Sequence, residues 1–123
     1  MASALAVLDV IEEDGLQRNS KERGAEVRAG FERLAKSHRL IGDVRGMGLM
    51  LGVELVRDRA SKEPAKQETA DVLEATREMG LLTGKGGIDG NVLRVQPPMC
   101  ITKADVEFAM DVFDRALTQV ARR

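Results

Sequence analysis

The sequence predicts an α+β domain, in which a small, mainly antiparallel sheet of about four strands is covered by helices on one face. Three observations predict this fold class. Four stretches place apolar residues at helical spacing, whereas short stretches between them alternate in polarity or form brief apolar runs. The expected order is helix, helix, strand, strand, helix, strand, strand, helix. At 123 residues the chain is long enough for one compact domain.

The first predicted helix covers residues 2–14. Leu5, Leu8 and Ile11 recur every third residue, and Gly15 is placed to end the helix. No strong cap opens it. The sequence therefore indicates a helix that is cut from something longer.

Residues 18–38 form the second predicted helix. A single stripe at helical spacing contains Val27, Phe31, Leu34 and His38. Asn19 or Ser20 is expected to cap its start.

A hairpin follows, because the period changes to two. Within residues 49–56 the apolar side chains that alternate onto one face are Leu49, Leu51, Val53 and Leu55. Residues 40–48 are strand-like, and Gly46 and Gly48 indicate a tight reversal. Gly52 is expected to allow close approach to the sheet.

The next segment is polar. Residues 57–66 contain Pro64 and are predicted to form an exposed connection. A third helix is expected over residues 66–79, then a short strand over 81–83 and a glycine-rich hairpin loop over 84–91.

The last strand and the last helix are separated by a double proline. The strand is predicted over residues 92–95, and Pro97-Pro98 ends it. Thr102 to Asp105 fits a capping box that opens the last helix. The apolar stripe of that helix contains Val106, Met110, Phe113, Leu117 and Val120.

Composition excludes several classes of function. The net charge is −1, and the chain has three Phe but no Tyr or Trp, so neither phosphate-backbone binding nor base stacking is expected. No apolar run approaches the roughly 20 residues that span a bilayer. The single cysteine fits a reducing compartment. We therefore expect no nucleic-acid partner, no membrane and a soluble, intracellular protein.

Two weak motifs have structural explanations. His38 and Cys100 could form a nucleophile pair, but each lies in an apolar context and is expected to be a packed residue. One His and one Cys are too few for a zinc site. Gly84-Lys85-Gly86-Gly87 lacks the spacing of a P-loop and is better explained as a plain hairpin loop.

Arg94 is the candidate functional residue, because it interrupts a short apolar strand. Strand alternation places Val92, Arg94 and Gln96 on one face, with Leu93 and Val95 on the other. Two interpretations stay open on the residues alone. Either Arg94 lies on a solvated face, or its planar guanidinium lines an active site and binds a carboxylate through two parallel hydrogen bonds.

The segments "IGDVRGMGLMLGVELV", "MGLLTGKGG" and "LRVQPPMCIT" together resemble one family. They follow one another as in the C-terminal domain of class III pyridoxal-phosphate aminotransferases of the ornithine and ω-amino-acid type. The resemblance extends over residues 1–123 and is strongest to the mitochondrial alanine–glyoxylate branch.

That resemblance implies an enzyme that moves an amino group from an amino acid, such as alanine, to a 2-oxo acid, such as glyoxylate. It implies pyridoxal phosphate as cofactor, an upstream cofactor-binding domain and a homodimer. Arg94 occupies the position of the arginine that binds the substrate carboxylate in the family, and Gln96 is expected to assist it. The compartment implied is the cytoplasm or the mitochondrial matrix.

The family's cofactor lysine has no counterpart here. Six lysines are present, and all are expected to be solvated: Lys21, Lys36, Lys62, Lys66, Lys85 and Lys103. We therefore expect residues 1–123 to be the small domain alone, with no catalytic residue, no metal and no activity in isolation. Two alternatives are a pyridoxal-phosphate phospho-lyase on the same scaffold and a stand-alone interaction domain without chemistry.

Overall fold

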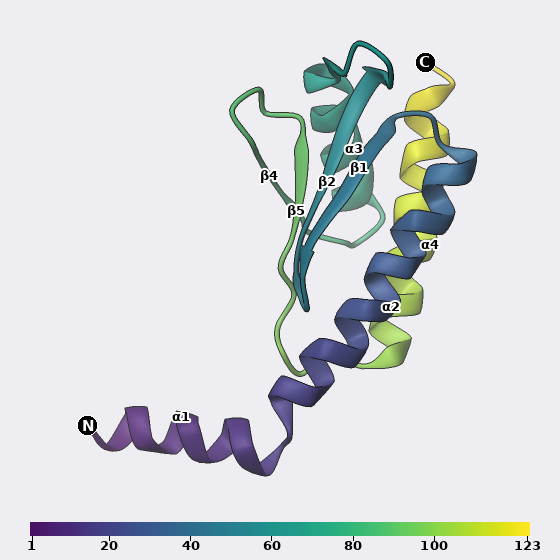
Figure 1. Ribbon diagram of the computed structural model, residues 1–123. Coiled ribbons are helices and arrows are strands. Elements are labelled where there is room, and N and C mark those ends of the chain that lie inside the picture. Colours follow the sequence, from purple (N-terminus) through teal and green to yellow (C-terminus); the bar gives the residue numbers. More distant parts are fainter.

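The computed structural model describes all 123 residues and contains four helices and five short strands (Figure 1). It confirms the α+β class. In chain order the elements are α1 (Ala2–Glu13), α2 (Leu16–Ser37), β1 (Ile41–Met47), β2 (Met50–Asp58), β3 (Glu63–Pro64), α3 (Lys66–Glu78), β4 (Gly84–Gly86), β5 (Val92–Val95) and α4 (Lys103–Ala121).

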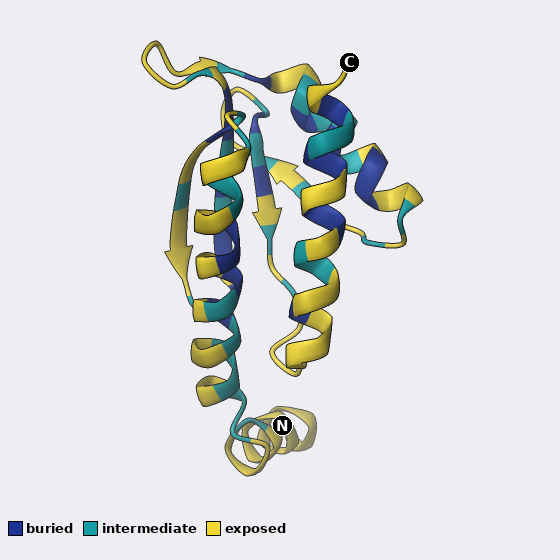
Figure 2. Ribbon diagram, turned by 90° about the vertical axis from the view of Figure 1, so that its right-hand side faces the viewer, coloured by how far each residue is buried: buried dark blue, intermediate teal, exposed yellow.

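The sheet is antiparallel, with the strand order β1-β2-β5-β4. Its inner face packs on the helices, and the side chains buried there include Leu51, Val53, Leu55 and Leu93. Its other face is open, since Met47 and Met50 are 85% and 66% exposed. Figure 2 shows this contrast between buried and exposed segments. Helices therefore cover one face of the sheet, as the sequence predicts.

The core joins α2 and α4 beneath the sheet. Phe31 of α2 and Phe113 of α4 are almost fully buried, and their ring centroids are 4.9 Å apart at an interplanar angle of 58°. Such a tilted aromatic pair adds favourable quadrupole contacts to the burial of apolar area. These two rings therefore fix α4 against α2.

The hairpin between β1 and β2 turns at Gly48, which has a φ of 53°. Its reversal brings Met47 opposite Met50 and confirms the predicted pair of strands. The turn lies directly against α2, because a Cβ on Gly24 would overlap the Gly48 carbonyl. A glycine at position 24 is thus required for α2 to approach the hairpin so closely.

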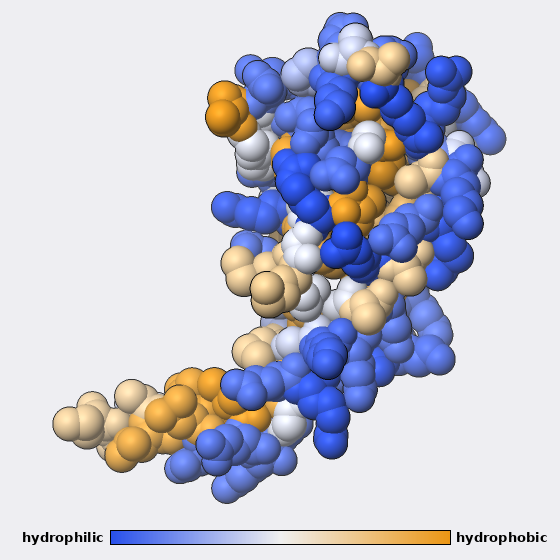
Figure 3. Space-filling model, viewed as in Figure 1, coloured by the Kyte–Doolittle hydropathy of each residue, from blue (hydrophilic) through white to orange (hydrophobic).

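Helix α1 projects away from the rest of the molecule (Figure 1). None of its residues is buried, and Leu5, Val7, Leu8 and Val10 are each about half exposed. Figure 3 shows these apolar side chains gathered on the projecting helix. The predicted stop is confirmed: Gly15 follows the helix in a left-handed conformation, with a φ of 60°. A helix this apolar is of the kind that is normally covered by other protein.

One prediction about the strands was wrong, and one strand was not predicted. The strand expected at 81–83 lies at Gly84–Gly86 instead, within the segment expected to be a loop. It pairs with β5, so backbone hydrogen bonding to a neighbour outweighs the low strand propensity of glycine. The two-residue strand β3 was not predicted, because it forms only through its long-range pairing with β2.

Two predictions about α2 also need correction. The helix begins at Leu16, so Asn19 and Ser20 lie inside it and neither caps it. His38 follows the last helical residue, and its ring Nε2 lies 2.6 Å from Asp114 Oδ1 on α4. The ring is thus a polar link between two helices as well as a packed residue.

The capping box predicted at the start of α4 is confirmed. The Thr102 hydroxyl accepts a hydrogen bond from the Asp105 backbone N–H at 3.2 Å, and the Asp105 carboxylate accepts from the Thr102 N–H at 2.7 Å. The backbone hydrogen bond from Thr102 holds the pKa of Asp105 below its ordinary value of 3.8. The carboxylate half of the box therefore contributes its full stability only while Asp105 is ionised.

We expect Thr102→Ala to lower the free energy of unfolding by about 1 kcal/mol at neutral pH. Asp105→Asn should also destabilise the fold there. The pKa of Asp105 is lower in the folded state than in the unfolded state. The stability that the ionised carboxylate contributes is therefore present above the unfolded-state pKa and is lost as the pH falls through the folded-state pKa. Urea unfolding at pH 7 and in the acid range below 3.8 checks this. An equal cost of Asp105→Asn at both pH values would contradict it.

No helix of the chain combines the length and apolar composition needed to cross a bilayer.

Candidate carboxylate-binding site

Arg94 lies in the middle of the sheet. Its strand β5 pairs with β2 on one side and with β4 on the other. Leu93 is fully buried against the helices, whereas Arg94 is exposed, so the alternation predicted from the sequence is confirmed. The guanidinium thus belongs to the open face of the sheet, on a backbone hydrogen-bonded at both edges.

Both cross-strand neighbours of Arg94 are glycines. Gly52 of β2 and Gly84 of β4 are its register partners. A Cβ on Gly84 would lie 3.7 Å from Arg94 Nε and 3.8 Å from Nη2, so the guanidinium extends over the β4 backbone. Side chains directly opposite each other on one sheet face are normally in contact. Gly52 and Gly84 have no side chains, so neither of them covers a flank of the Arg94 guanidinium.

Arg94 also has no charged partner. Its guanidinium makes no hydrogen bond and no ion pair within the chain, and the only side-chain hydrogen bond that reaches Arg94 goes from the Thr83 hydroxyl to the Arg94 carbonyl, at 3.2 Å. Arg45 on β1 is the contrasting case. Its Nη1 binds Asp43 at 2.9 Å and Glu54 at 2.7 Å. These hydrogen bonds, the one to Asp43 being the larger cause, raise the pKa of Arg45.

A groove of about 520 Å³ lies where the end of β5 meets α4 and the segment before β4. Arg94 and Gln96 both line it, so the structure brings the two predicted site residues together. Its walls are mostly apolar and come from the segment before β4 and from α4, including Leu81, Leu82, Phe108 and Met110. An apolar groove with a few polar groups is typical of small-molecule sites.

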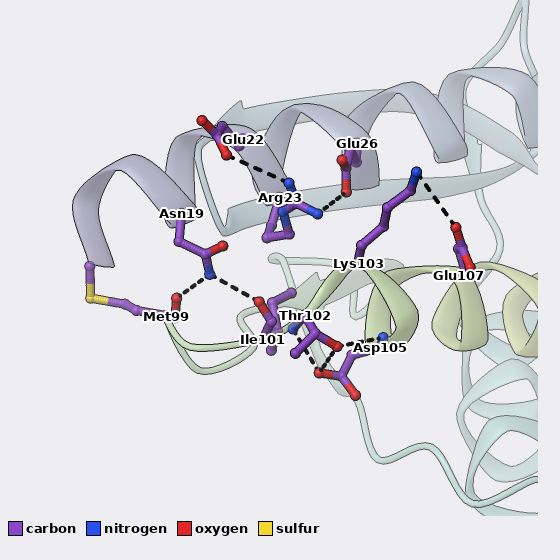
Figure 4. Close-up of polar contacts among 10 residues, drawn as sticks. All are labelled: Asn19, Glu22, Arg23, Glu26, Met99, Ile101, Thr102, Lys103, Asp105 and Glu107. Atoms are coloured by element: carbon purple, nitrogen blue, oxygen red, sulfur yellow. Dashed lines mark hydrogen bonds and ion pairs between the residues drawn. The ribbon is translucent and has the colours of Figure 1, made fainter. Parts of the chain in front are cut away.

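The chain leaves the site through Pro97-Pro98 and is then fixed to α2. Asn19 donates hydrogen bonds from its amide nitrogen to the carbonyls of Met99, at 2.7 Å, and Ile101, at 2.9 Å (Figure 4). Sequence reasoning missed this role, because the spacing near Asn19 resembled a helix cap. The two bonds hold the segment between β5 and α4 in one position.

The exposed lysines and the buried polar side chains of the chain differ from those that a pyridoxal-phosphate site needs. Such a site needs a lysine for the covalent link and an acidic partner for the pyridine nitrogen. All six lysines are exposed, and the buried polar side chains are Thr69, Thr76 and Asn91, none of them acidic. The segment Gly84–Gly86 is an edge strand with no helix following it, so it does not cradle a phosphate either.

The two other candidates do not come together. Cys100 is exposed, contrary to the expectation that it is packed. It lies beside the start of α2, whereas His38 follows the opposite end of this 22-residue helix. Because such a helix is about 33 Å long, the two side chains cannot form a nucleophile pair. No cluster of three His, Cys, Asp or Glu side chains could hold a metal ion.

Comparisons with known proteins place the chain in one family. The family described as "Aminotransferase class-III" matches residues 1–117. Alanine–glyoxylate aminotransferase 2 homolog 2, mitochondrial, of Arabidopsis thaliana is 46% identical over 118 residues, which are 96% of this chain and 25% of that protein.

Two solved structures share the fold. A Bacillus anthracis aminotransferase has a TM-score of 0.88 at 32% identity, over 94% of this chain and 27% of its own. A phospholyase from Arthrobacter in complex with phosphoethanolamine has a TM-score of 0.90 at 28% identity, over 95% of this chain and 28% of its own. The chain therefore spans about a quarter of the length of the relatives it matches.

Proposed function

The chain belongs to the class-III aminotransferase family, and on this premise we propose that residues 1–123 form the C-terminal, substrate-binding domain of a pyridoxal-phosphate-dependent transaminase. The observation that carries the proposal is Arg94. A guanidinium without a partner, on a central strand between two glycines, is arranged to receive a carboxylate from outside the chain.

Amino acids and 2-oxo acids are the proposed substrates, with alanine as donor and glyoxylate as acceptor. The 46% identity to an alanine–glyoxylate aminotransferase supports this pair. Arg94 binds the carboxylate that both substrates carry, and the hydrogen-bonded sheet holds its backbone in place. Gln96 lines the same groove, and we propose that it donates a further hydrogen bond to the substrate. Pyridoxal phosphate, when bound, supplies the electron sink for amino transfer.

The cofactor and the catalytic lysine are proposed to lie in a larger domain upstream of this one, in an enzyme that is a homodimer. Two features support that arrangement. The relatives are about four times as long as this chain and α1 exposes an apolar surface over Leu5, Val7, Leu8 and Val10. We propose the mitochondrial matrix or the cytoplasm as compartment, the former because the Arabidopsis relative is described as mitochondrial.

The 123-residue chain is expected to retain no pyridoxal phosphate, because all of its lysines are exposed. Mixing it with the cofactor, dialysing, and recording the visible absorbance with and without alanine checks this. The absence of a cofactor band is the expected result. A retained band that shifts on addition of alanine would show that one of the six lysines forms a working site. It would contradict the proposal that the cofactor and the catalytic lysine lie in another domain.

A phospho-lyase is the second candidate, because the Arthrobacter phospholyase has the same fold with a TM-score of 0.90. Assays of the complete enzyme distinguish the transaminase from the phospho-lyase. Glyoxylate-dependent loss of alanine supports the transaminase, whereas release of inorganic phosphate from phosphoethanolamine supports the lyase. A third possibility, a stand-alone interaction domain, requires that neither reaction occurs and that the chain is a stable monomer that binds no small carboxylate.

A further inference from the structure

Two arginines lie in one row across the open face of the sheet. The register places Arg45 opposite Gly52 on β2, and Gly52 opposite Arg94 on β5. Partners in antiparallel strands share a face, so both guanidinium groups belong to the same surface. Since β2 is the only strand between them, their backbones are about 10 Å apart. The residue between them is glycine, and the nearest side chain above it is that of Val92, whose Cγ1 would lie 3.2 Å from a Cβ on Gly52.

This arrangement has the dimensions of a site for a dicarboxylate. Two long arginine side chains about 10 Å apart at the backbone can reach the two ends of a four- or five-carbon diacid. Only one of the two is free. Arg94 makes no ion pair, whereas Arg45 is bound by Asp43 and Glu54 through the same nitrogen, Nη1.

We propose that Asp43 and Glu54 make this site selective for monocarboxylic substrates, by occupying the arginine that would otherwise bind a second carboxylate. The proposal rests on the proposed role of Arg94. It assigns a substrate class to the site, namely acids with one carboxylate beside the reacting carbon. It also assigns specificity-determining roles to two residues that do not touch that carboxylate.

Two effects are expected to disfavour a substrate with a second carboxylate. A second carboxylate placed near Arg45 finds its donor already shared between two acceptors. It also lies close to two negative charges, and like charges brought together oppose binding. Together Arg45, Arg94, Asp43 and Glu54 have a net charge of zero. Neutralising one of the two carboxylates by substitution raises this net charge to +1, and neutralising both raises it to +2.

The test is a titration of the 123-residue chain with propionate and with glutarate, followed by the NMR signals of the arginine Nε–H groups. In the wild type both anions should shift the Arg94 signal with similar dissociation constants, and Arg45 should not respond. In the double variant Asp43→Asn, Glu54→Gln the affinity for glutarate relative to propionate should rise about fivefold, the upper range for an exposed ion pair. The Arg45 signal should then shift with glutarate as well.

The chain offers a matched control. Arg57 on β2 also binds two carboxylates, Glu68 at 2.8 Å and Glu63 at 3.1 Å. The variant Glu63→Gln, Glu68→Gln removes the same total charge from another arginine and should leave the glutarate-to-propionate ratio unchanged. Adding Arg45→Met to the Asp43→Asn, Glu54→Gln variant should abolish the gain.

An unchanged ratio in the Asp43→Asn, Glu54→Gln variant, or an equal gain in the Glu63→Gln, Glu68→Gln control, overturns this inference and leaves the proposed transaminase intact. A response of Arg45 to glutarate in the wild type also overturns it. If Arg94 responds to neither anion, the carboxylate site itself is wrong, and both proposals fail together. In the complete enzyme, the same double variant should lower KM for a dicarboxylic 2-oxo acid more than for glyoxylate.

Discussion

Replacing Arg94 with alanine in the complete enzyme is expected to lower kcat/KM for alanine and glyoxylate by about 30- to 150-fold. That factor corresponds to the loss of one charge-assisted contact, about 2–3 kcal/mol. No internal partner depends on Arg94, so the fold should keep its stability to within about 0.5 kcal/mol. Steady-state kinetics with each substrate, together with thermal unfolding of the variant, measure both effects.

Arg94→Lys keeps the charge but loses the planar fork, and should recover only part of the activity. Arg33→Ala is a suitable control, since Arg33 is an exposed arginine of α2 that forms no ion pair. Kinetics of Arg94→Ala that match those of Arg33→Ala would remove Arg94 from the site. The solvated-face interpretation of the strand would then be the correct one.

Truncating Phe31 to alanine is expected to lower the free energy of unfolding by about 3–5 kcal/mol, the range for a buried aromatic side chain. Phe31 is fully buried and its ring packs on Phe113. Its loss leaves a cavity between α2 and α4, and a well-packed core relaxes only partly around such a gap. Urea unfolding of the 123-residue chain measures the cost.

Phe108→Ala gives the comparison on α4, because Phe108 is 50% exposed. Its truncation should cost well under half as much, since less apolar area leaves contact with protein. Equal costs at the two positions would contradict the full burial of Phe31 between α2 and α4. The two variants also separate stability from binding, since Phe108 lines the groove and Phe31 does not.

Periodicity predicted α2, α3 and α4 well, because each of these helices buries a stripe of side chains in the core. The stripe that contains Phe31 and the capping box at Thr102 are both present as predicted. Glycine made the edge strand unpredictable. Gly84–Gly86 has no side-chain pattern, and its strand conformation comes from pairing with β5, which is a tertiary interaction.

For the site, strand alternation placed Arg94 on the correct face, but the residues around it were not predictable. That both of its cross-strand neighbours are glycines depends on the register of β2, β5 and β4. The two partners of Arg45, Asp43 and Glu54, likewise depend on the pairing of β1 with β2. Asn19 was misassigned because its partners lie about 80 residues away, at Met99 and Ile101.

The two hydrogen bonds of Asn19 have a mechanical consequence. They attach the segment after Pro98 to α2 about one helical turn, or roughly 6 Å, from Gly15, where α1 and α2 meet. Any rotation about that junction displaces points in proportion to their distance from it. A tilt of about 5° moves the far end of α2, about 33 Å away, by roughly 3 Å, but the attached segment by only about 0.5 Å. The exit of the Arg94 strand thus lies near the pivot, and its position depends little on the angle between α1 and the rest of the domain.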